Sequence, residues 1–304
     1  GDCVSVCPSG SLEFTPLPST SFWALLDFYK GKKILLVDEK FSLENLEISL
    51  DKNVLPLVLN SAQLNETTLL ALLQTSGANI TLCATRLSKG NEDAIALLNA
   101  IFERKFNKKA ILVAFDKESL EKALKECEFI DDLRFDLPQH PMLKREHFAK
   151  RLLHIVENDD LGVVESGEWL RYGQVRVNET NCTLCLACVG ACNVGALVAD
   201  SKDNSLKFNA SLCTTCGYCV ASCAEKDTIE LERSGIELKA SYFHFHTLAH
   251  DELFACMECG KEFATKKAVE RVANLMKDKF AGNERKLKTL YCCAECKARL
   301  MIFS

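Results

Sequence analysis

The chain has 304 residues, an apolar share of 48% and a formal net charge of −5, so it is long enough for two or three domains with a sizeable core. Because the net charge is negative, the chain has no excess of Lys and Arg that would attract an anionic partner. We therefore expect neither nucleic acid nor an anionic membrane surface as a partner. Its apolar runs, such as residues 34–37 and 54–59, are far shorter than the roughly 20 residues of a transmembrane helix.

The first residues contain Cys3-x-x-x-Cys7-Pro8. The chain opens on Gly1 and Asp2 without a Met or a signal pattern, and we read this start as a cut. We interpret Cys3 and Cys7 as the end of a cysteine motif of the kind that recurs later in the chain, with its first cysteines upstream of Gly1. Two free cysteines in a frayed terminus are the alternative.

Residues 31–130 alternate short apolar runs with stretches of helical periodicity, the pattern of a parallel sheet covered by helices. The expected strands are residues 34–37, 54–59, 80–84 and 110–115, and the expected helices are residues 66–75, 91–106 and 118–127. Sheets of this kind often bind a nucleotide or a flavin. Only the turn at residues 85–90 offers basic residues and a glycine, so we favour a scaffold, with cofactor binding as the alternative.

Residues 131–141 are predicted to form a connector, followed by a helix over residues 143–157 and a strand over residues 174–178. Cysteine motifs begin soon after Tyr172. We therefore expect five segments, namely an N-terminal remnant (1–30), an α/β domain (31–130), a connector with a helix (131–171), a cysteine-motif module (172–235) and a C-terminal metal-knuckle segment (236–304).

Twelve of the seventeen cysteines fall into closely spaced C-x-x-C arrangements. This is metal-site spacing rather than a disulfide framework, so we expect a reducing compartment, the cytoplasm. Cys83 and Cys127 stand alone in apolar surroundings and are predicted to be inert buried thiols.

Cys182-x-x-Cys185-x-x-Cys188-x-x-x-Cys192 recurs 31 positions later. In such a repeat three cysteines of one motif and the fourth of the other hold each [4Fe-4S] cluster. The expected ligand sets are Cys182, Cys185, Cys188 and Cys223 for one cluster, and Cys213, Cys216, Cys219 and Cys192 for the other. A pair of zinc sites is the alternative, but zinc usually takes two C-x-x-C pairs rather than repeated triples.

The segment at residues 178–231 resembles the bacterial 2[4Fe-4S] ferredoxin family, with all eight ligand cysteines present. The proline that usually follows the fourth cysteine is replaced by Asn193 and by Ala224, which removes no ligand. The resemblance implies an α+β module that carries electrons. By the same resemblance, Cys3 and Cys7 look like the tail of a further ferredoxin motif with its proline, Pro8, intact.

Two further C-x-x-C pairs, Cys256 with Cys259 and Cys293 with Cys296, flank a predicted helix over residues 265–279. Four thiolates suit a closed tetrahedral zinc site. A third [4Fe-4S] cluster or a rubredoxin-like iron is the alternative, and Cys292 could replace Cys293 but would break the two-residue spacing. His244 and His246 alternate with phenylalanines as in a strand, so these two and His250 are expected to be exposed or packed rather than ligands.

The order of these parts, with the segments at residues 53–60 and 254–263, resembles a family of proteobacterial 4Fe-4S binding proteins. That resemblance implies redox protein partners, with anaerobic respiratory enzymes such as formate dehydrogenase as a loose association. We predict an α/β domain, a ferredoxin-like module and a zinc-ribbon-like segment that together carry single electrons, with no residue acting as acid, base or nucleophile. A flavin- or nucleotide-binding oxidoreductase subunit and a cluster- and zinc-stabilised assembly protein are the alternatives.

Overall fold

The computed structural model describes residues 2–41, 48–137 and 142–302. The chain divides into two compact units. The first comprises Gly1–Gln174, Ala210–Thr215 and Arg233–His244, and the second comprises Val175–Asn209, Cys216–Glu232 and Phe245–Ser304. Each unit therefore combines stretches that are separate in the sequence. The five continuous segments expected from the sequence are a different kind of division, and their boundaries stay predictions.

The first unit is built on a four-stranded parallel sheet, as predicted. Its strands lie in the order β2-β1-β3-β4, with bounds β1 Lys33–Asp38, β2 Val54–Leu59, β3 Ile80–Cys83 and β4 Ile111–Ala114. The central strand β1 has Leu35, Leu36 and Val37 buried. Because both faces of a parallel sheet are covered, its strands are continuous apolar runs rather than alternating ones.

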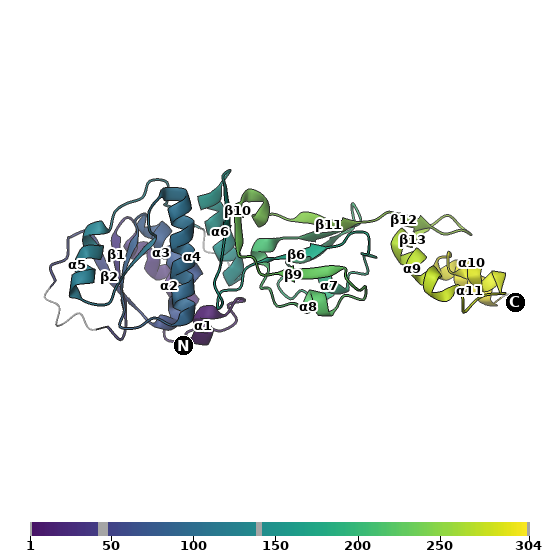
Figure 1. Ribbon diagram of the computed structural model, residues 1–304, viewed down its shortest axis with the longest axis horizontal. Coiled ribbons are helices and arrows are strands. Elements are labelled where there is room, and N and C mark those ends of the chain that lie inside the picture. Colours follow the sequence, from purple (N-terminus) through teal and green to yellow (C-terminus); the bar gives the residue numbers. More distant parts are fainter. Residues whose placement is uncertain (1, 42–47, 138–141, 303–304) are drawn as a thin grey trace. The chain divides into compact units, whose positions relative to one another are not determined.

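Helices follow the last three strands, namely α3 (Glu66–Ser76), α4 (Lys89–Phe106) and α5 (Lys117–Glu126). Their first turns are capped by the side chains of Asn65, Ser88 and Asp116, each accepting from backbone amides of the helix. Figure 1 shows α5 on one side of the sheet and α3 and α4 on the other. On the α5 side, Leu35, Val37 and Leu120 belong to one apolar cluster.

Helix α6 (Lys144–Val156) packs against α3. The Gln74 side-chain amide donates to the backbone carbonyl of Arg151 at 2.9 Å, and the Arg151 guanidinium donates to Gln74 Oε1 at 3.1 Å. The remaining elements of this unit are α1 (Asp2–Val6), α2 (Ser19–Leu25), η1 (Leu26–Tyr29), η2 (Ser61–Gln63), η3 (Ala210–Leu212), η4 (Ala240–Phe243) and the antiparallel pair β5 (Asp160–Val164) and β10 (Ile236–Lys239).

The second unit consists of small sheets and short helices. Strand β6 (Gln174–Val177) pairs with β9 (Ile229–Glu232), and β8 (Ser205–Phe208) lies between β7 (Leu197–Asp200) and β11 (His246–His250) in an antiparallel sheet. The other elements are α7 (Ala187–Gly190), α8 (Tyr218–Ala221), the hairpin β12 (Leu253–Ala255) and β13 (Glu262–Thr265), α9 (Lys266–Met276), α10 (Glu284–Thr289) and α11 (Ala294–Ile302).

The strand expected around His244 begins later than predicted. Phe243 ends the 3₁₀ turn η4 and is buried, whereas Phe245 is 44% exposed, and the strand begins only at His246. The prediction of a strand through Phe243 is therefore wrong, because the alternating pattern continues into the end of a 3₁₀ turn.

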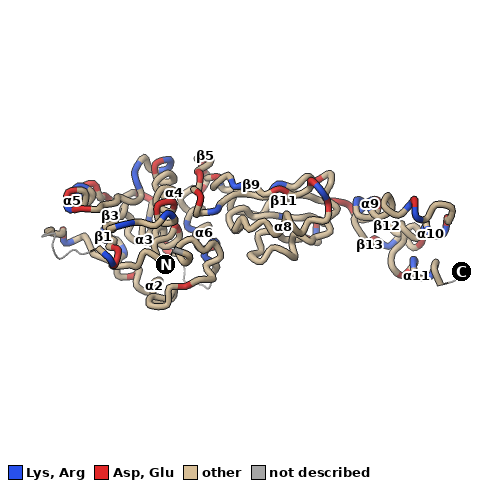
Figure 2. The backbone as a smooth tube through the Cα atoms, turned by 60° about the horizontal axis from the view of Figure 1, so that its bottom comes forward, with Lys and Arg blue, Asp and Glu red and all other residues tan. Residues whose placement is uncertain are grey.

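Acidic and basic residues are interspersed along both units (Figure 2). Among the helices that the structure describes, none is long and apolar enough to cross a membrane.

Candidate functional site

The two repeated cysteine loops follow the same backbone path. Left-handed residues occur at Leu184 and Leu186 in the first loop, with φ of 53° and 60°, and at Thr215 and Gly217 in the second, with φ of 50° and 83°. These positions are 31 residues apart, like the cysteines. The left-handed conformation costs a residue other than glycine about 1–2 kcal/mol. Leu184, Leu186 and Thr215 would not adopt it by their own backbone preference, so their conformation points to a functional constraint on both loops.

Four cysteines of the first predicted ligand set line one pocket in the second unit. These are Cys182, Cys185 and Cys188 from the first motif and Cys223 from the second, and Leu184 and Ile229 line the same pocket. Leu184 is 9% exposed and Ile229 6% exposed. Thiols converging from both motifs on an apolar-walled pocket fit the donor set of a [4Fe-4S] cluster.

Burial raises the pKa of the Cys182 thiol, opposed by the backbone amide of Leu184. Burial and the neighbouring cysteines also raise the pKa of Cys188, to about 11. These thiols therefore stay protonated at neutral pH until a metal replaces the proton, which is the usual linkage between thiolate ligation and proton release. The amides near the sulfurs are placed to stabilise the negative charge that ligation creates.

In the second motif, burial raises the pKa of Cys219, and the neighbouring thiols of Cys216 and Cys192 add to this rise. These three thiols thus belong to one electrostatic environment within the second unit. Cys213 belongs to the first unit, where it accepts a 3.4 Å hydrogen bond from the Thr215 amide. Ligation by the second predicted set stays a prediction.

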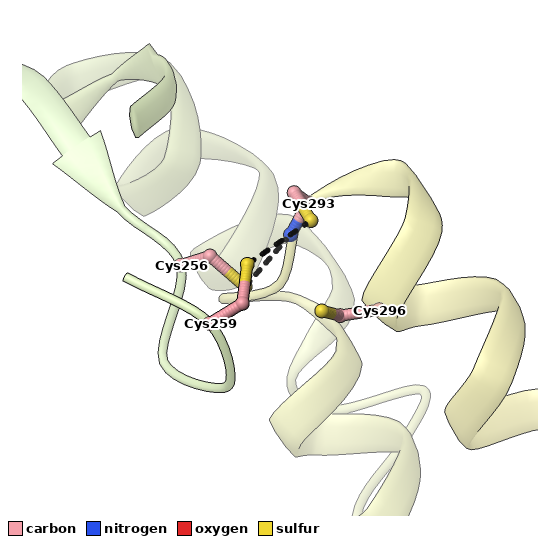
Figure 3. Close-up of side chains that lie close together, drawn as sticks. All are labelled: Cys256, Cys259, Cys293 and Cys296. Atoms are coloured by element: carbon pink, nitrogen blue, oxygen red, sulfur yellow. Dashed lines mark hydrogen bonds between the residues drawn. The ribbon is translucent and has the colours of Figure 1, made fainter. Parts of the chain in front are cut away.

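The four cysteines of the C-terminal pairs converge on one point (Figure 3). The sulfurs of Cys256, Cys259, Cys293 and Cys296 all lie within 4.8 Å of one another, and those of Cys259 and Cys293 are 3.8 Å apart. Zinc–sulfur bonds of about 2.3 Å in a tetrahedron put two sulfurs about 3.8 Å apart. The geometry therefore fits a single tetrahedral metal ion.

The first pair lies in the turn between β12 and β13, and Cys296 lies in the first turn of α11. Gly260 takes a φ of 72°, and its amide donates to the Cys256 carbonyl at 2.9 Å, which closes the knuckle. The Cys293 amide donates to Cys256 Sγ at 3.3 Å and ties the two pairs together. This group contains Cys293 and not Cys292, whose thiol donates to the Lys288 carbonyl at 3.3 Å.

The remaining sequence candidates lie away from these groups. His244, His246 and His250 are exposed, and His250 Nδ1 lies 2.6 Å from Glu179 Oε1. Cys83 and Cys127 are buried, and burial raises the pKa of both thiols, that of Cys83 to about 12. This fits the prediction of inert thiols.

At the N-terminus, Cys3 is exposed and Cys7 is half-buried. Burial alone would raise the pKa of Cys7, but the Ser9 hydroxyl and the amides of Leu12, Ser11 and Gly10 more than offset it and lower the pKa. A thiolate-stabilising environment is compatible with the expected ligand role of Cys7, which stays a prediction.

Sequence reasoning missed the residues of α9 and its N-cap that reach the first cysteine loop. Thr265 Oγ1 donates to the Thr183 carbonyl at 2.8 Å, and Arg271 forms an ion pair with Glu225, which lines the pocket. No local pattern marks these contacts, because their partners lie tens of positions apart.

Residues 174–224 match a protein family described as a 4Fe-4S dicluster domain. This chain contains a 4Fe-4S dicluster domain. The matched segment includes all eight repeated cysteines, and such a domain implies two [4Fe-4S] clusters and electron transfer through them. No curated protein matches the chain.

Proposed function

We propose that the chain is an electron carrier or a redox-complex subunit that transfers single electrons through two [4Fe-4S] clusters. One observation carries the proposal, namely that three cysteines of the first motif and one of the second line a single pocket. Crossed ligation of this kind holds two clusters close together in one module. The proposed ligand sets are Cys182, Cys185, Cys188 and Cys223, and Cys213, Cys216, Cys219 and Cys192.

When bound, the clusters supply reversible one-electron chemistry at the thiolate-held iron. The cysteine sulfurs of the chain bind the iron, and backbone amides point at those sulfurs. The buried side chains of Leu184, Leu197 and Ile229 shield the iron from water. Electron transfer under this proposal needs no residue to act as acid, base or nucleophile.

Exchange of electrons with other proteins requires access to the clusters. Cys185 and Cys216 hold equivalent positions in the two motifs, and both are exposed. Leu186, Tyr218 and Val220 beside them are also exposed. These cysteines give redox protein partners a short route to each cluster, and a respiratory oxidoreductase is one class of partner that the sequence resemblance suggests.

We also propose that the C-terminal cysteines hold one structural zinc ion. The sulfur–sulfur distance of 3.8 Å between Cys259 and Cys293 and the four-thiol donor set support it. Four protein ligands leave no open position, so the ion would stabilise the segment rather than activate water.

Anaerobic metal and sulfide analysis of the purified chain tests both proposals, together with electron paramagnetic resonance after dithionite reduction. About eight irons, about eight sulfides and one zinc per chain, with a signal from interacting reduced clusters, are the expected result. Zinc in several equivalents without sulfide would refute electron transfer, and about nine irons without zinc would assign iron to the C-terminal site.

A further inference from the structure

We propose that helix α9 sets the reduction potential of the cluster at Cys182, Cys185, Cys188 and Cys223 through the ion pair between Arg271 and Glu225. This inference rests on the proposed electron-transfer function. It gives the C-terminal four-cysteine segment a role in tuning one cluster, beyond stabilising its own fold.

The start of α9 is fastened to the first cysteine loop. Thr265, the N-cap residue of α9, donates from Oγ1 to the carbonyl of Thr183 at 2.8 Å. Lys267 Nζ donates to the Glu179 carbonyl at 2.8 Å, and its charge is among those that act on the Cys182 thiol. The helix therefore begins against the segment that supplies the first ligand.

One helical turn further along, Arg271 pairs with Glu225, whose Oε1 accepts from Thr183 Oγ1 at 3.5 Å. Its Nε lies 3.1 Å from Glu225 Oε2. Glu225 lines the cysteine pocket, and its backbone carbonyl oxygen lies 3.3 Å from Cys223 Sγ. The Glu225 side chain is 16% exposed, so solvent screens its charge less than it screens a surface carboxylate.

These charges bear directly on the reduction equilibrium, since a cluster gains one negative charge when it is reduced. A nearby carboxylate opposes that gain, and the guanidinium paired with it offsets the opposition. The repeat makes the effect specific to one cluster, because the position equivalent to Glu225 in the first motif, 31 residues earlier, is the uncharged Val194. The ion pair thus distinguishes two otherwise similar sites.

The four-cysteine site joins the chain on the N-terminal side of α9 to the chain on its C-terminal side. Cys256 and Cys259 precede the helix in sequence, Cys293 and Cys296 follow it, and their sulfurs meet at one point. A metal ion there ties the chain before α9 to the chain after it. Occupancy of this site is therefore expected to affect the potential of the first cluster.

The test is potentiometric titration of the full, cluster-loaded chain with Arg271→Gln, Glu225→Gln and the double variant, with exposed Lys279→Gln as control. We expect Arg271→Gln to lower one of two midpoints, Glu225→Gln to raise the same one, and the double variant to return towards the parent. The expected change in the reduced-to-oxidised ratio at fixed potential is threefold to tenfold, or about 30 to 60 mV for a one-electron couple. Lys279→Gln and the second midpoint should not move.

A Cys296→Ser chain gives a second, independent readout, because loss of the metal should move the same midpoint and leave the other unchanged. The inference is overturned if both single charge variants shift the midpoint in one direction, or if neither shifts it while iron and sulfide content stay at the parent level. A parent chain without iron and sulfide would instead refute the proposed function itself.

Discussion

Thr265 Oγ1 donates a hydrogen bond to the Thr183 carbonyl at 2.8 Å, and the same oxygen accepts from the Ala268 amide at 3.4 Å. Thr265 and Thr183 are 9% and 8% exposed. One hydroxyl therefore caps α9 and joins the C-terminal segment to the loop that begins the first cysteine motif.

Replacing Thr265 with Val should destabilise the second unit by about 1–3 kcal/mol, because the helix loses its cap and a buried carbonyl loses its donor. Thermal unfolding followed by loss of the clusters' visible absorbance measures the effect. Thr265→Ser keeps the hydroxyl and is the matched control. Equal stability of the two variants would show that the hydroxyl contributes nothing.

Replacing Cys188 with Ala should remove one cluster and lower the iron and sulfide content from about eight to about four per chain. The reason is that Cys188 lines the pocket with three other predicted ligands. Cys83→Ala is the control, since Cys83 is a fully buried thiol of the parallel sheet. Retention of all the iron in Cys188→Ala would contradict the ligand assignment.

Replacing Cys256 with Ser should release the proposed zinc ion and leave the iron content unchanged, because a structural zinc site needs all four of its ligands. Metal analysis by mass spectrometry after desalting measures both. Cys292→Ser should keep the zinc, since Cys292 is buried nearby but lies outside the four-thiol group. Zinc loss in Cys292→Ser with retention in Cys293→Ser would reverse that assignment.

His147 should make the stability of the first unit depend on pH. It stacks on Trp23 with ring centroids 4.7 Å apart, and burial, with Arg151 next in effect, lowers the pKa of His147 from 6.5 to about 4. A depressed histidine pKa means that the unfolded chain takes up the proton first, so stability present above pH 6.5 is lost as the pH falls towards 4.

Replacing His147 with Phe keeps an aromatic ring on Trp23 and removes the titration. We expect the drop in unfolding free energy between pH 7 and pH 5 to shrink by about 1–2 kcal/mol in this variant. Urea unfolding followed by tryptophan fluorescence reports it, with exposed His244→Phe as the control. An unchanged pH dependence would mean that His147 titrates normally in the folded chain.

Local patterns in the sequence were sufficient to predict the strands and helices of the parallel-sheet domain. Strand β1 and helix α3 could be predicted because their apolar periodicity and caps are local properties, as Leu35 and Asn65 illustrate. The spacing within each C-x-x-C pair likewise restricts how far its two sulfurs can separate. The strand near His244 was misplaced because a 3₁₀ turn and a strand can share one short alternating pattern.

The sequence by itself determined which chemistry the chain can hold: repeated cysteine motifs for [4Fe-4S] clusters, a four-cysteine group that could hold a metal, and an apolar α/β scaffold. Only the tertiary structure decided which residues surround those sites. Arg271 meets Glu225, and Thr265 meets Thr183, across 46 and 82 positions of chain respectively. Such contacts depend on how separate segments pack together, and no local spacing records that packing.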